Sequence, residues 1–452
     1  MREPLHWASI GELGRAFRRG DLSPSAYLAH QLARIDRIDP GLHSIIHLDR
    51  AGAIAAAQAA DRRLAQGRGL GPLDGIPVGI KDMIDVAGMP TTCHSALRLG
   101  QVATQDADVV AHLRRAGAII LGKLATHEFA IGGPAFDLPF PPARNPWNLA
   151  HHPGGSSSGA GAGVAAGLFP AAVGTDTAGS VRNPASACGV VGIKPTYDLV
   201  SRRGVVPLAW SLDHVGPIAR CVGDAALLLD AMGAPRETPF GAGIGQGVQG
   251  MRIGVVGHFH TEDMIADPAT YDAIDRVAQG LRESGAQVEP VRLPALGLFN
   301  AVNRVLLQAE GYAVHGEEMA AHPDMFSVLT RKALLPGAFL GAGDLVAAMR
   351  HRHALIEAVE AVFETVDVLL CASSMMPACA IEDPAEVART YMLQARAPFN
   401  VTGHPALALM AGLSPGGLPI GVQLAARMGD EQTLFQVAAQ WETMAGTCHP
   451  PV

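Results

Sequence analysis

The chain has 452 residues, of which 48% are hydrophobic and 17% charged, and its formal net charge is −8. This composition is typical of a folded globular protein and excludes a long disordered chain. No basic run is longer than a pair such as Arg18-Arg19, so the sequence lacks the basic stripe of a nucleic-acid-binding protein.

The first 65 residues carry helical patterns. Ser9 is placed to cap one helix, and Ser23-Pro24 opens a second. A short apolar run at 44–48 predicts a strand, and the alanine-rich segment 51–65 predicts a third helix.

From residue 71 onward, short apolar runs alternate with helical patterns. Strands are predicted at 76–80, 118–121, 171–174, 252–256, 288–293, 366–371, 406–411 and 420–425. Helices are predicted at 107–116, 268–283, 342–363 and 430–444. The alternation predicts an α/β fold, with a central mixed β-sheet covered by helices on both faces. We expect one domain over 1–452, made of an N-terminal helical region (1–70), a central segment (71–220) and the remaining sheet and helices (251–452), with glycine-rich 241–250 as a surface linker.

The segment Gly79-Ile80-Lys81-Asp82 places a lysine directly after an apolar strand. Most lysines are solvated surface residues, and this segment alone favours that interpretation. A lysine in dry surroundings has a lowered pKa, because burial disfavours the charged form. Its neutral amine can then serve as a general base near pH 7.

A glycine- and serine-rich segment, HPGGSSSGAGAG, spans 152–163. It lacks the Lys-Ser/Thr pair of a phosphate-binding P-loop. Gly161-x-Gly163-x-x-Ala166 partly matches a dinucleotide loop and Gly155-x-Ser157-x-Gly159 fits a nucleophile elbow, but no predicted strand precedes either. A flexible linker is the remaining alternative, although an apolar stretch typical of a buried helix follows at once. Serines at a helix start provide hydroxyls together with unpaired N–H groups.

A third segment, Gly174-Thr175-Asp176-Thr177-Ala178-Gly179-Ser180-Val181-Arg182, is built mainly from small residues. Such a chain can curl so that successive N–H groups converge and bind an oxyanion. A serine at its end would hold its hydroxyl beside that point. An ordinary turn is the alternative interpretation.

The order and spacing of these segments are more informative than any one of them. Ser156 and Ser180 lie 24 residues apart. Further motifs are PAS at 184–186, GIKPT at 192–196, SLDHVGP at 211–217 and GLPIGVQ at 417–423. Together they resemble the amidase signature family, from the N-terminal helices to about Met444.

The resemblance implies a hydrolase that cuts a C–N acyl bond. Ser180 is implied as the nucleophile that forms an acyl-enzyme, Ser156 as a bridging serine after a cis peptide from Gly155, and Lys81 as the base. This agrees with the chemistry, since a serine at its free pKa is a poor nucleophile and needs a base. The implied oxyanion hole is formed by the N–H groups of Thr177, Ala178, Gly179 and Ser180. The implied supporting residues are Ser157, Asp176 and Arg182, and the acyl side of the cleft is lined by Ile131, Gly132 and Gly133.

Two departures from the family pattern bear on the expected function. Many relatives have glycine where Ala178 stands, so this loop is expected to be slightly stiffer. The glutamine-hydrolysing component of tRNA-dependent amidotransferases, which the sequence also resembles, holds the glutamine amine with an acidic residue. The comparable segment here, YMLQARAPFN at 391–400, contains no Asp or Glu. This argues against glutamine as the substrate.

We therefore expect a stand-alone hydrolase of small neutral aryl or alkyl amides or anilides, with carbamates (urethanes) and esters as further substrates. The alternatives are the glutamine-hydrolysing component of a tRNA-dependent amidotransferase, a ureide or biuret-type hydrolase, an α/β-hydrolase with Ser157 as nucleophile, and an oxidoreductase that uses the glycine loop. Trp210 and Phe399 are candidate pocket walls, with core packing as the competing interpretation.

Six scattered cysteines without a C-x-x-C motif indicate a reducing compartment, and the N-terminus lacks the apolar core of a signal peptide. We predict a cytoplasmic location, no cofactor and no metal. The predicted partner is a small-molecule amide, with neither nucleic acid nor membrane, and a homodimer is the candidate assembly.

Overall fold

The helices with clear capping signals begin where the sequence predicts. In a computed structural model that describes residues 4–446 and 448–452, α1 (Ile10–Arg19) follows Ser9, whose hydroxyl accepts a hydrogen bond from the Glu12 N–H. The helix α9 (Pro268–Glu283) follows Asp267, whose side chain accepts from the Ala269 N–H. Capping satisfies N–H groups that have no partner within the helix.

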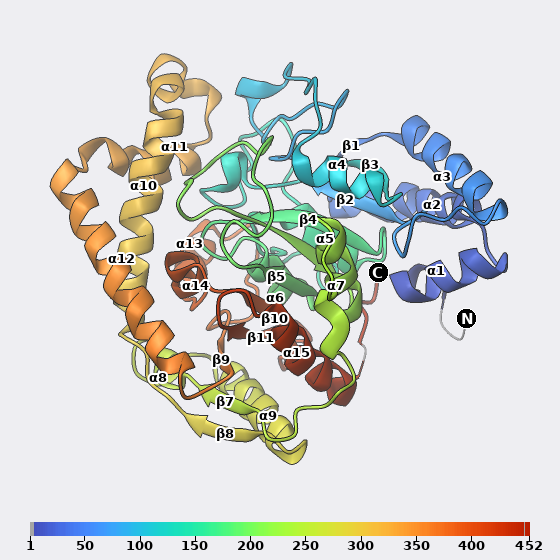
Figure 1. Cartoon of the computed structure of the whole chain (residues 1–452). Helices are drawn as coiled ribbons and strands as arrows, with labels where there is room; N and C mark the ends of the chain where they lie inside the picture. The colour runs from blue at the N-terminus through green and yellow to red at the C-terminus, as the bar shows by residue number, and fades with distance from the viewer. Residues whose placement is uncertain (1–3, 447) are drawn as a thin grey trace.

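One mixed sheet runs through the molecule, and helices cover both of its faces (Figure 1). Its eleven strands lie in the order β1-β3-β2-β4-β6-β5-β10-β11-β9-β7-β8. Their bounds are β1 Ile45–Leu48, β2 Pro77–Lys81, β3 Ile119–Leu124, β4 Ala171–Asp176, β5 Val191–Lys194, β6 His214–Ala219, β7 Arg252–Val255, β8 Gln287–Pro290, β9 Val368–Ala372, β10 Ala406–Leu413 and β11 Pro419–Ala426. The predicted α/β class and mixed central sheet are confirmed.

The remaining helices pack on this sheet or extend from it. They are α2 Pro24–Leu42, α3 Arg50–Ala65, α4 Asp108–Arg115, α5 Ser158–Ala165, α6 Arg182–Cys188, α7 Val222–Ala231, α8 His258–Thr261, α10 Leu296–Ala321, α11 Val328–Leu334, α12 Ala342–Phe363, α13 Pro384–Met392, α14 Ala397–Thr402 and α15 Glu431–Ala445. Among the described residues, no single helix is both long and apolar enough to cross a membrane.

The glycine-rich segment 241–250 is more ordered than the linker that the sequence predicts. A 3₁₀ turn covers Phe240–Gly243, and both Phe240 and Val248 are buried. The apolar side chains flanking the glycines anchor the segment against α7 and α15. The segment is therefore part of the packed structure.

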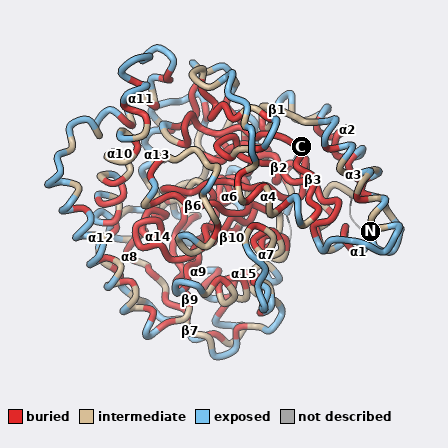
Figure 2. Tube along the Cα trace, turned by 45° about the horizontal axis from the view of Figure 1, so that its top comes forward, coloured by how far each residue is buried: buried red, intermediate tan, exposed pale blue. Residues whose placement is uncertain are grey.

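The centre of the sheet is the most deeply buried part of the molecule (Figure 2). Every residue of β2 and β4 is buried, and these two strands are parallel neighbours. Strands covered on both faces are made of small and apolar residues. β2 ends at Lys81, and β4 ends at Thr175 and Asp176, which lie in the segment that carries Ser180.

Candidate active site

Lys81 is the last residue of β2 and is fully buried. Its Nζ donates to Ser156 Oγ at 2.8 Å and to Thr175 Oγ1 at 2.7 Å. Burial lowers the pKa of Lys81 to about 7, although the negative charges of Asp176 and Asp213 oppose the effect. A substantial fraction of the amine is therefore neutral near pH 7.

Thr175 belongs to the segment that the sequence singled out, but its contact with Lys81 was not predicted. It lies on β4, two residues after Val173, which pairs with Ile80 of β2. Parallel neighbouring strands end at the same edge of a sheet, so this register brings the threonine hydroxyl to the lysine. The pairing of the two strands is the only signal that could have identified it.

Ser156 follows a cis peptide from Gly155, as expected. The Ser156 carbonyl accepts a hydrogen bond from the His127 N–H at 3.1 Å. A Cβ on Gly155 would lie 2.2 Å from His127 Cε1 and 2.7 Å from Tyr391 Oη. Only glycine fits at this position, because His127 and Tyr391 close on the backbone directly before Ser156.

The loop that carries Ser180 is folded around a buried carboxylate. It connects β4, which ends at Asp176, to α6, which begins at Arg182. Asp176 accepts hydrogen bonds from the N–H groups of Gly179 at 2.8 Å and Val181 at 3.1 Å, and its ion pair with Arg182 is 2.9 Å long. Burial alone would raise the pKa of Asp176, but the adjacent Arg182 guanidinium outweighs it and holds the pKa well below its usual range. The carboxylate is therefore ionised.

This arrangement corrects one part of the predicted oxyanion hole. The Gly179 N–H donates a hydrogen bond to Asp176 Oδ1, so it does not point toward the substrate's carbonyl oxygen. In the part of the chain that the structure describes, the N–H groups of Thr177, Ala178 and Ser180 have no protein acceptor. The reason is the backbone at Gly179, where φ is +117° and the N–H turns inward.

Arg182 is braced by residues that lie more than 200 positions away in the sequence. Its Nη1 donates to Gln423 Oε1 at 2.5 Å and to the Arg396 carbonyl at 2.9 Å. Its Nη2 donates to Asn400 Oδ1 at 2.6 Å, and Asn400 Nδ2 returns a bond to Asp176 Oδ1 at 2.8 Å. The predicted supporting pair thus extends into a buried network. Gln423 is the last residue of the motif GLPIGVQ at 417–423, and this motif was the only sign in the sequence that Gln423 has a role near the site.

Ser157 has a different place from the other two serines. It is fully buried, and its Oγ donates to the Thr175 carbonyl at 3.2 Å and accepts from the Thr175 N–H at 3.3 Å. These bonds tie the start of α5 to β4. They leave Ser157 outside the cavity described next and argue against it as a nucleophile. No strand leads directly into the segment, because β3 ends at Leu124, well before residue 152, so the nucleophile-elbow and dinucleotide-loop alternatives are both disfavoured.

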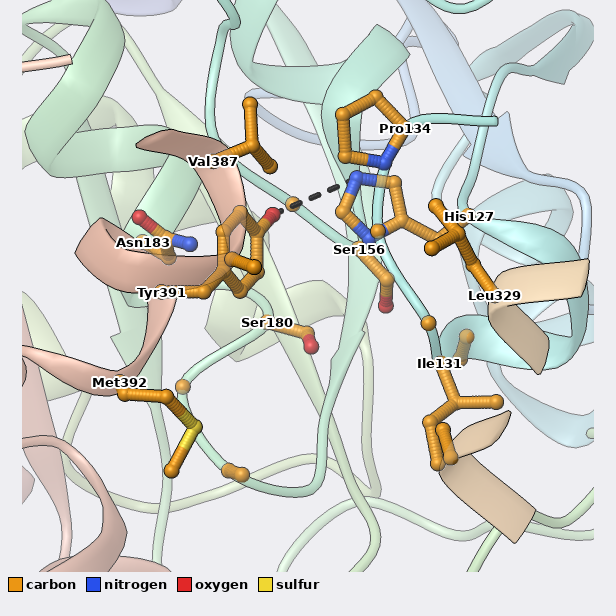
Figure 3. Close-up of a pocket in the computed structure, with 18 of the residues that line it drawn as sticks. His127, Ile131, Pro134, Ser156, Ser180, Asn183, Leu329, Val387, Tyr391 and Met392 are labelled. Carbon is orange, nitrogen blue, oxygen red and sulfur yellow. Dashed lines mark hydrogen bonds between the residues drawn. The ribbon is translucent and has the colours of Figure 1, made fainter. Parts of the chain in front are cut away.

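A cavity of about 1110 Å³ opens over Ser156 and Ser180 (Figure 3). The predicted substrate-binding residues Ile131, Gly132 and Gly133 all line it. Its other walls come from α10, α11 and α13, and include Asn303, Leu307, Leu329, Ala333, Val387, Tyr391 and Met392. Tyr391 and Met392 belong to the segment 391–400 that the sequence comparison brought into question, whereas the residues from α10 and α11 were not predicted, because they meet the cavity only through tertiary packing.

The two candidate aromatic walls take other positions. Phe399 is fully buried in the core, as the competing interpretation has it, whereas Trp210 is 53% exposed. Neither lines the cavity over the serines. Tyr391 takes that role instead, and its hydroxyl lies 3.3 Å from His127 Nε2. Burial, reinforced by the charge of Lys81, holds the pKa of His127 well below its usual range, so the ring is neutral.

Comparison with known proteins gives a consistent result. A family model described as Amidase matches residues 26–435. The A component of the glutamyl-tRNA(Gln) amidotransferase of Geobacter metallireducens is 36% identical, over 96% of this chain and 96% of that protein. The native peptide amidase of Stenotrophomonas maltophilia superposes with a TM-score of 0.87 at 28% identity, over 99% of each chain. A structure described as a vestigial protein complex that reveals the evolutionary origins of an s-triazine catabolic enzyme superposes with a TM-score of 0.91 at 32% identity, over 98% of this chain and 100% of that chain.

Proposed function

The chain belongs to the amidase signature family of enzymes that act on C–N bonds, and from this premise we propose that it is a stand-alone hydrolase of small neutral amides. Aryl and alkyl amides, including anilides, are the proposed substrates, with carbamates (urethanes) and esters as further ones. The observation that carries the proposal is the 2.8 Å contact between Lys81 Nζ and Ser156 Oγ beside a cavity that also holds Ser180.

In the proposed reaction, neutral Lys81 takes a proton from Ser156 while Ser156 takes the proton of Ser180. Ser180 Oγ then attacks the substrate carbonyl carbon, and the resulting oxyanion faces the N–H groups of Thr177, Ala178 and Ser180. The proton returns through Ser156 to the leaving nitrogen as the C–N bond breaks. A water molecule, deprotonated along the same path, hydrolyses the acyl-enzyme and releases the acid.

The lining of the cavity supports a neutral substrate. Ile131, Leu329, Val387 and Met392 present apolar side chains to it. Its two acidic residues already have partners: Asp137 accepts from the Val328 N–H at 3.1 Å, and Glu382 pairs with Arg144 at 2.9 Å. Neither carboxylate is buried in the cavity without a partner, which is how a site built for an ammonium group would present one.

The glutamine-hydrolysing component of an amidotransferase is the second candidate, because relatives with that name are 35–36% identical over nearly the whole chain. Against it, the segment 391–400 brings Tyr391, Gln394 and Arg396 to the cavity but no acid. The Arg396 guanidinium is a cation and would repel the α-ammonium group of glutamine. The likeness to the structure connected with an s-triazine catabolic enzyme keeps a ureide or biuret-type substrate as a third candidate.

The test is a substrate panel offered to the purified chain alone: a chromogenic anilide, a primary amide, a ureide, a carbamate, an ester and glutamine. We expect turnover of the neutral amides, and its loss in Ser180→Ala. Turnover of glutamine alone, or activity only after a partner protein is added, would contradict the proposal.

We also propose the cytoplasmic location predicted from the sequence. In the described residues, all six cysteines are unpaired, and Cys93, Cys188 and Cys371 are buried. Unpaired buried cysteines are the usual state in a reducing compartment.

A further inference from the structure

Arg396 is a buried cation that forms no ion pair within the described residues. It directly precedes α14, and its side chain is only 3% exposed. Its Nη1 donates to the Ser373 carbonyl at 2.9 Å and to Ser374 Oγ at 2.5 Å, but its Nε has no partner. Both contacts are to neutral oxygens, so no carboxylate offsets the charge.

The side chain of Arg396 lies against the loop of the nucleophile. A Cβ added to Gly179 would stand 2.5 Å from Arg396 Nε and 2.6 Å from Cδ. Arg396 also lines the same cavity as Ser180. The loop therefore has the Asp176 carboxylate on its inner side and this side chain packed on its glycine.

The titratable groups that face Arg396 are those of Arg182, Asp176, Tyr391 and His152. Burial raises the pKa of Tyr391 and lowers that of His152 to about 4, so these two side chains are neutral. Burial, reinforced by Arg182, lowers the pKa of Arg396 to about 9, so the guanidinium stays charged at neutral pH.

Asp176 and Arg182 neutralise one another through their ion pair. Asp213 adds a negative charge beside the loop, where it accepts from Thr177 Oγ1 at 2.6 Å. Among the described residues, Arg396 is the cation next to this loop that has no carboxylate partner of its own.

An oxyanion that develops at this loop meets an ionised carboxylate close by. Gly179 has given its N–H to that carboxylate, which leaves fewer amide donors for the oxyanion than the sequence predicts. Oriented charge in a dry site has a large effect on a developing negative charge, because little water screens it.

We propose that Arg396 is a positioning residue whose positive charge, packed against Gly179, stabilises the oxyanion formed at Ser180. The inference rests on the proposed acyl-transfer chemistry. The competing role is structural: the contacts to Ser373 and Ser374 fasten the end of β9 to the loop. Only the first role depends on the charge itself.

The test compares Arg396→Met, Arg396→Gln and Arg396→Lys with Arg34→Met as a matched control. Arg34 is also buried and pairs with no Asp or Glu in the described chain. It donates to the Ala166 carbonyl at 3.0 and 2.8 Å and to the main-chain oxygen of Val452 at 3.2 Å, outside the cavity. Each variant is measured for thermal stability, for kcat and KM on an anilide, and for the rate at which a fluorophosphonate labels Ser180. In the labelling reaction Ser180 Oγ bonds to phosphorus and fluoride leaves, through a five-coordinate state whose phosphoryl oxygen carries the developing negative charge. The reaction needs no knowledge of the natural substrate.

We expect R396M and R396Q to slow labelling and kcat by about 10- to 100-fold, with KM changed less than about threefold, whereas R34M lowers stability and labels within about twofold of wild type. The labelling rates of wild type and R396K are both expected to fall at high pH, where the side chain at position 396 loses its charge. The pKa of Arg396 is about 9, and a buried lysine loses its proton at a lower pH than a buried arginine does, so the fall comes at a lower pH in R396K than in wild type.

Labelling by R396M at the wild-type rate would overturn the proposal. The proposal would also be overturned if R396K labelled more slowly than wild type but with the same dependence on pH, because the charge would then have no role. This comparison can be made even if R396M and R396Q do not fold. If wild-type protein is labelled at Ser180 but hydrolyses none of the amides, the proposed function is refuted. The role of Arg396 is then judged from the labelling rates alone.

Discussion

Replacing Lys81 with methionine tests how the protein holds its proposed base. Burial lowers the pKa of Lys81 from 10.5 to about 7. A difference of about 3.5 pH units, at ~1.4 kcal/mol each, means that holding this lysine in the folded protein costs about 5 kcal/mol at pH 7 and below. Methionine is of similar size and carries no charge, so Lys81→Met removes that cost.

The substitution also removes two hydrogen bonds. Ser156 Oγ and Thr175 Oγ1 lose their donor, at about 1 kcal/mol each. We therefore expect the free energy of unfolding of K81M to exceed that of wild type by about 3 kcal/mol at pH 6. Between pH 7 and 10.5 the unfolded wild-type chain binds a proton that the folded chain does not, so wild-type stability rises with pH and the advantage of K81M disappears.

The assay is urea unfolding of both proteins at about pH 6, 8 and 10, together with Ser180 labelling. Labelling by K81M should fall about 10²- to 10⁴-fold, because the general base is gone, and wild-type kcat/KM should rise with pH up to about 7 and then level off. Lys194→Met is the matched control: Lys194 is also fully buried with its pKa held well below the usual value by burial, but it does not line the cavity. It should show the stability gain without the loss of labelling. A stability difference for K81M that is independent of pH, or a K81M that is less stable at pH 6, would refute the reasoning.

Four further substitutions test the loop around Ser180 and the serine beside it. Gly179→Ala should reduce labelling at least ~100-fold, because φ is +117° and the new Cβ would meet Arg396 at 2.5 Å; wild-type labelling would contradict the inward turn of this loop. Ser157→Ala should keep labelling within about tenfold of wild type, whereas Ser180→Ala should abolish it, and mass spectrometry of the labelled peptide separates the two serines. Asp176→Asn should lower the free energy of unfolding by about 3–5 kcal/mol in urea, since it leaves a buried arginine without its counter-charge, and an unchanged unfolding midpoint would argue against this ion pair as a structural element.

Local sequence predicts an element well where the deciding interactions are themselves local. Residues 268–283 and 342–363 form α9 and α12 with the predicted bounds, because caps and helical spacing are contained in each segment. The long helix α10 was missed: Ala295 gives no capping side chain, and Gly311 and Gly316 interrupt the pattern. The strand β6 was missed because Gly216 and Pro217 break its apolar run, yet pairing with β4 holds it in the sheet.

The sequence by itself determined the α/β class, the family and the three residues proposed for catalysis, because their motifs are short and occur in a fixed order. Tertiary structure alone decided the state of these residues. Dry packing between β2 and β4 lowers the pKa of Lys81, and the turn at Gly179 withdraws one predicted oxyanion donor. It also brings Arg396 to Gly179 across more than 200 residues. Burial, charge balance and such distant contacts are properties of the packed molecule, so no local pattern of residues encodes them.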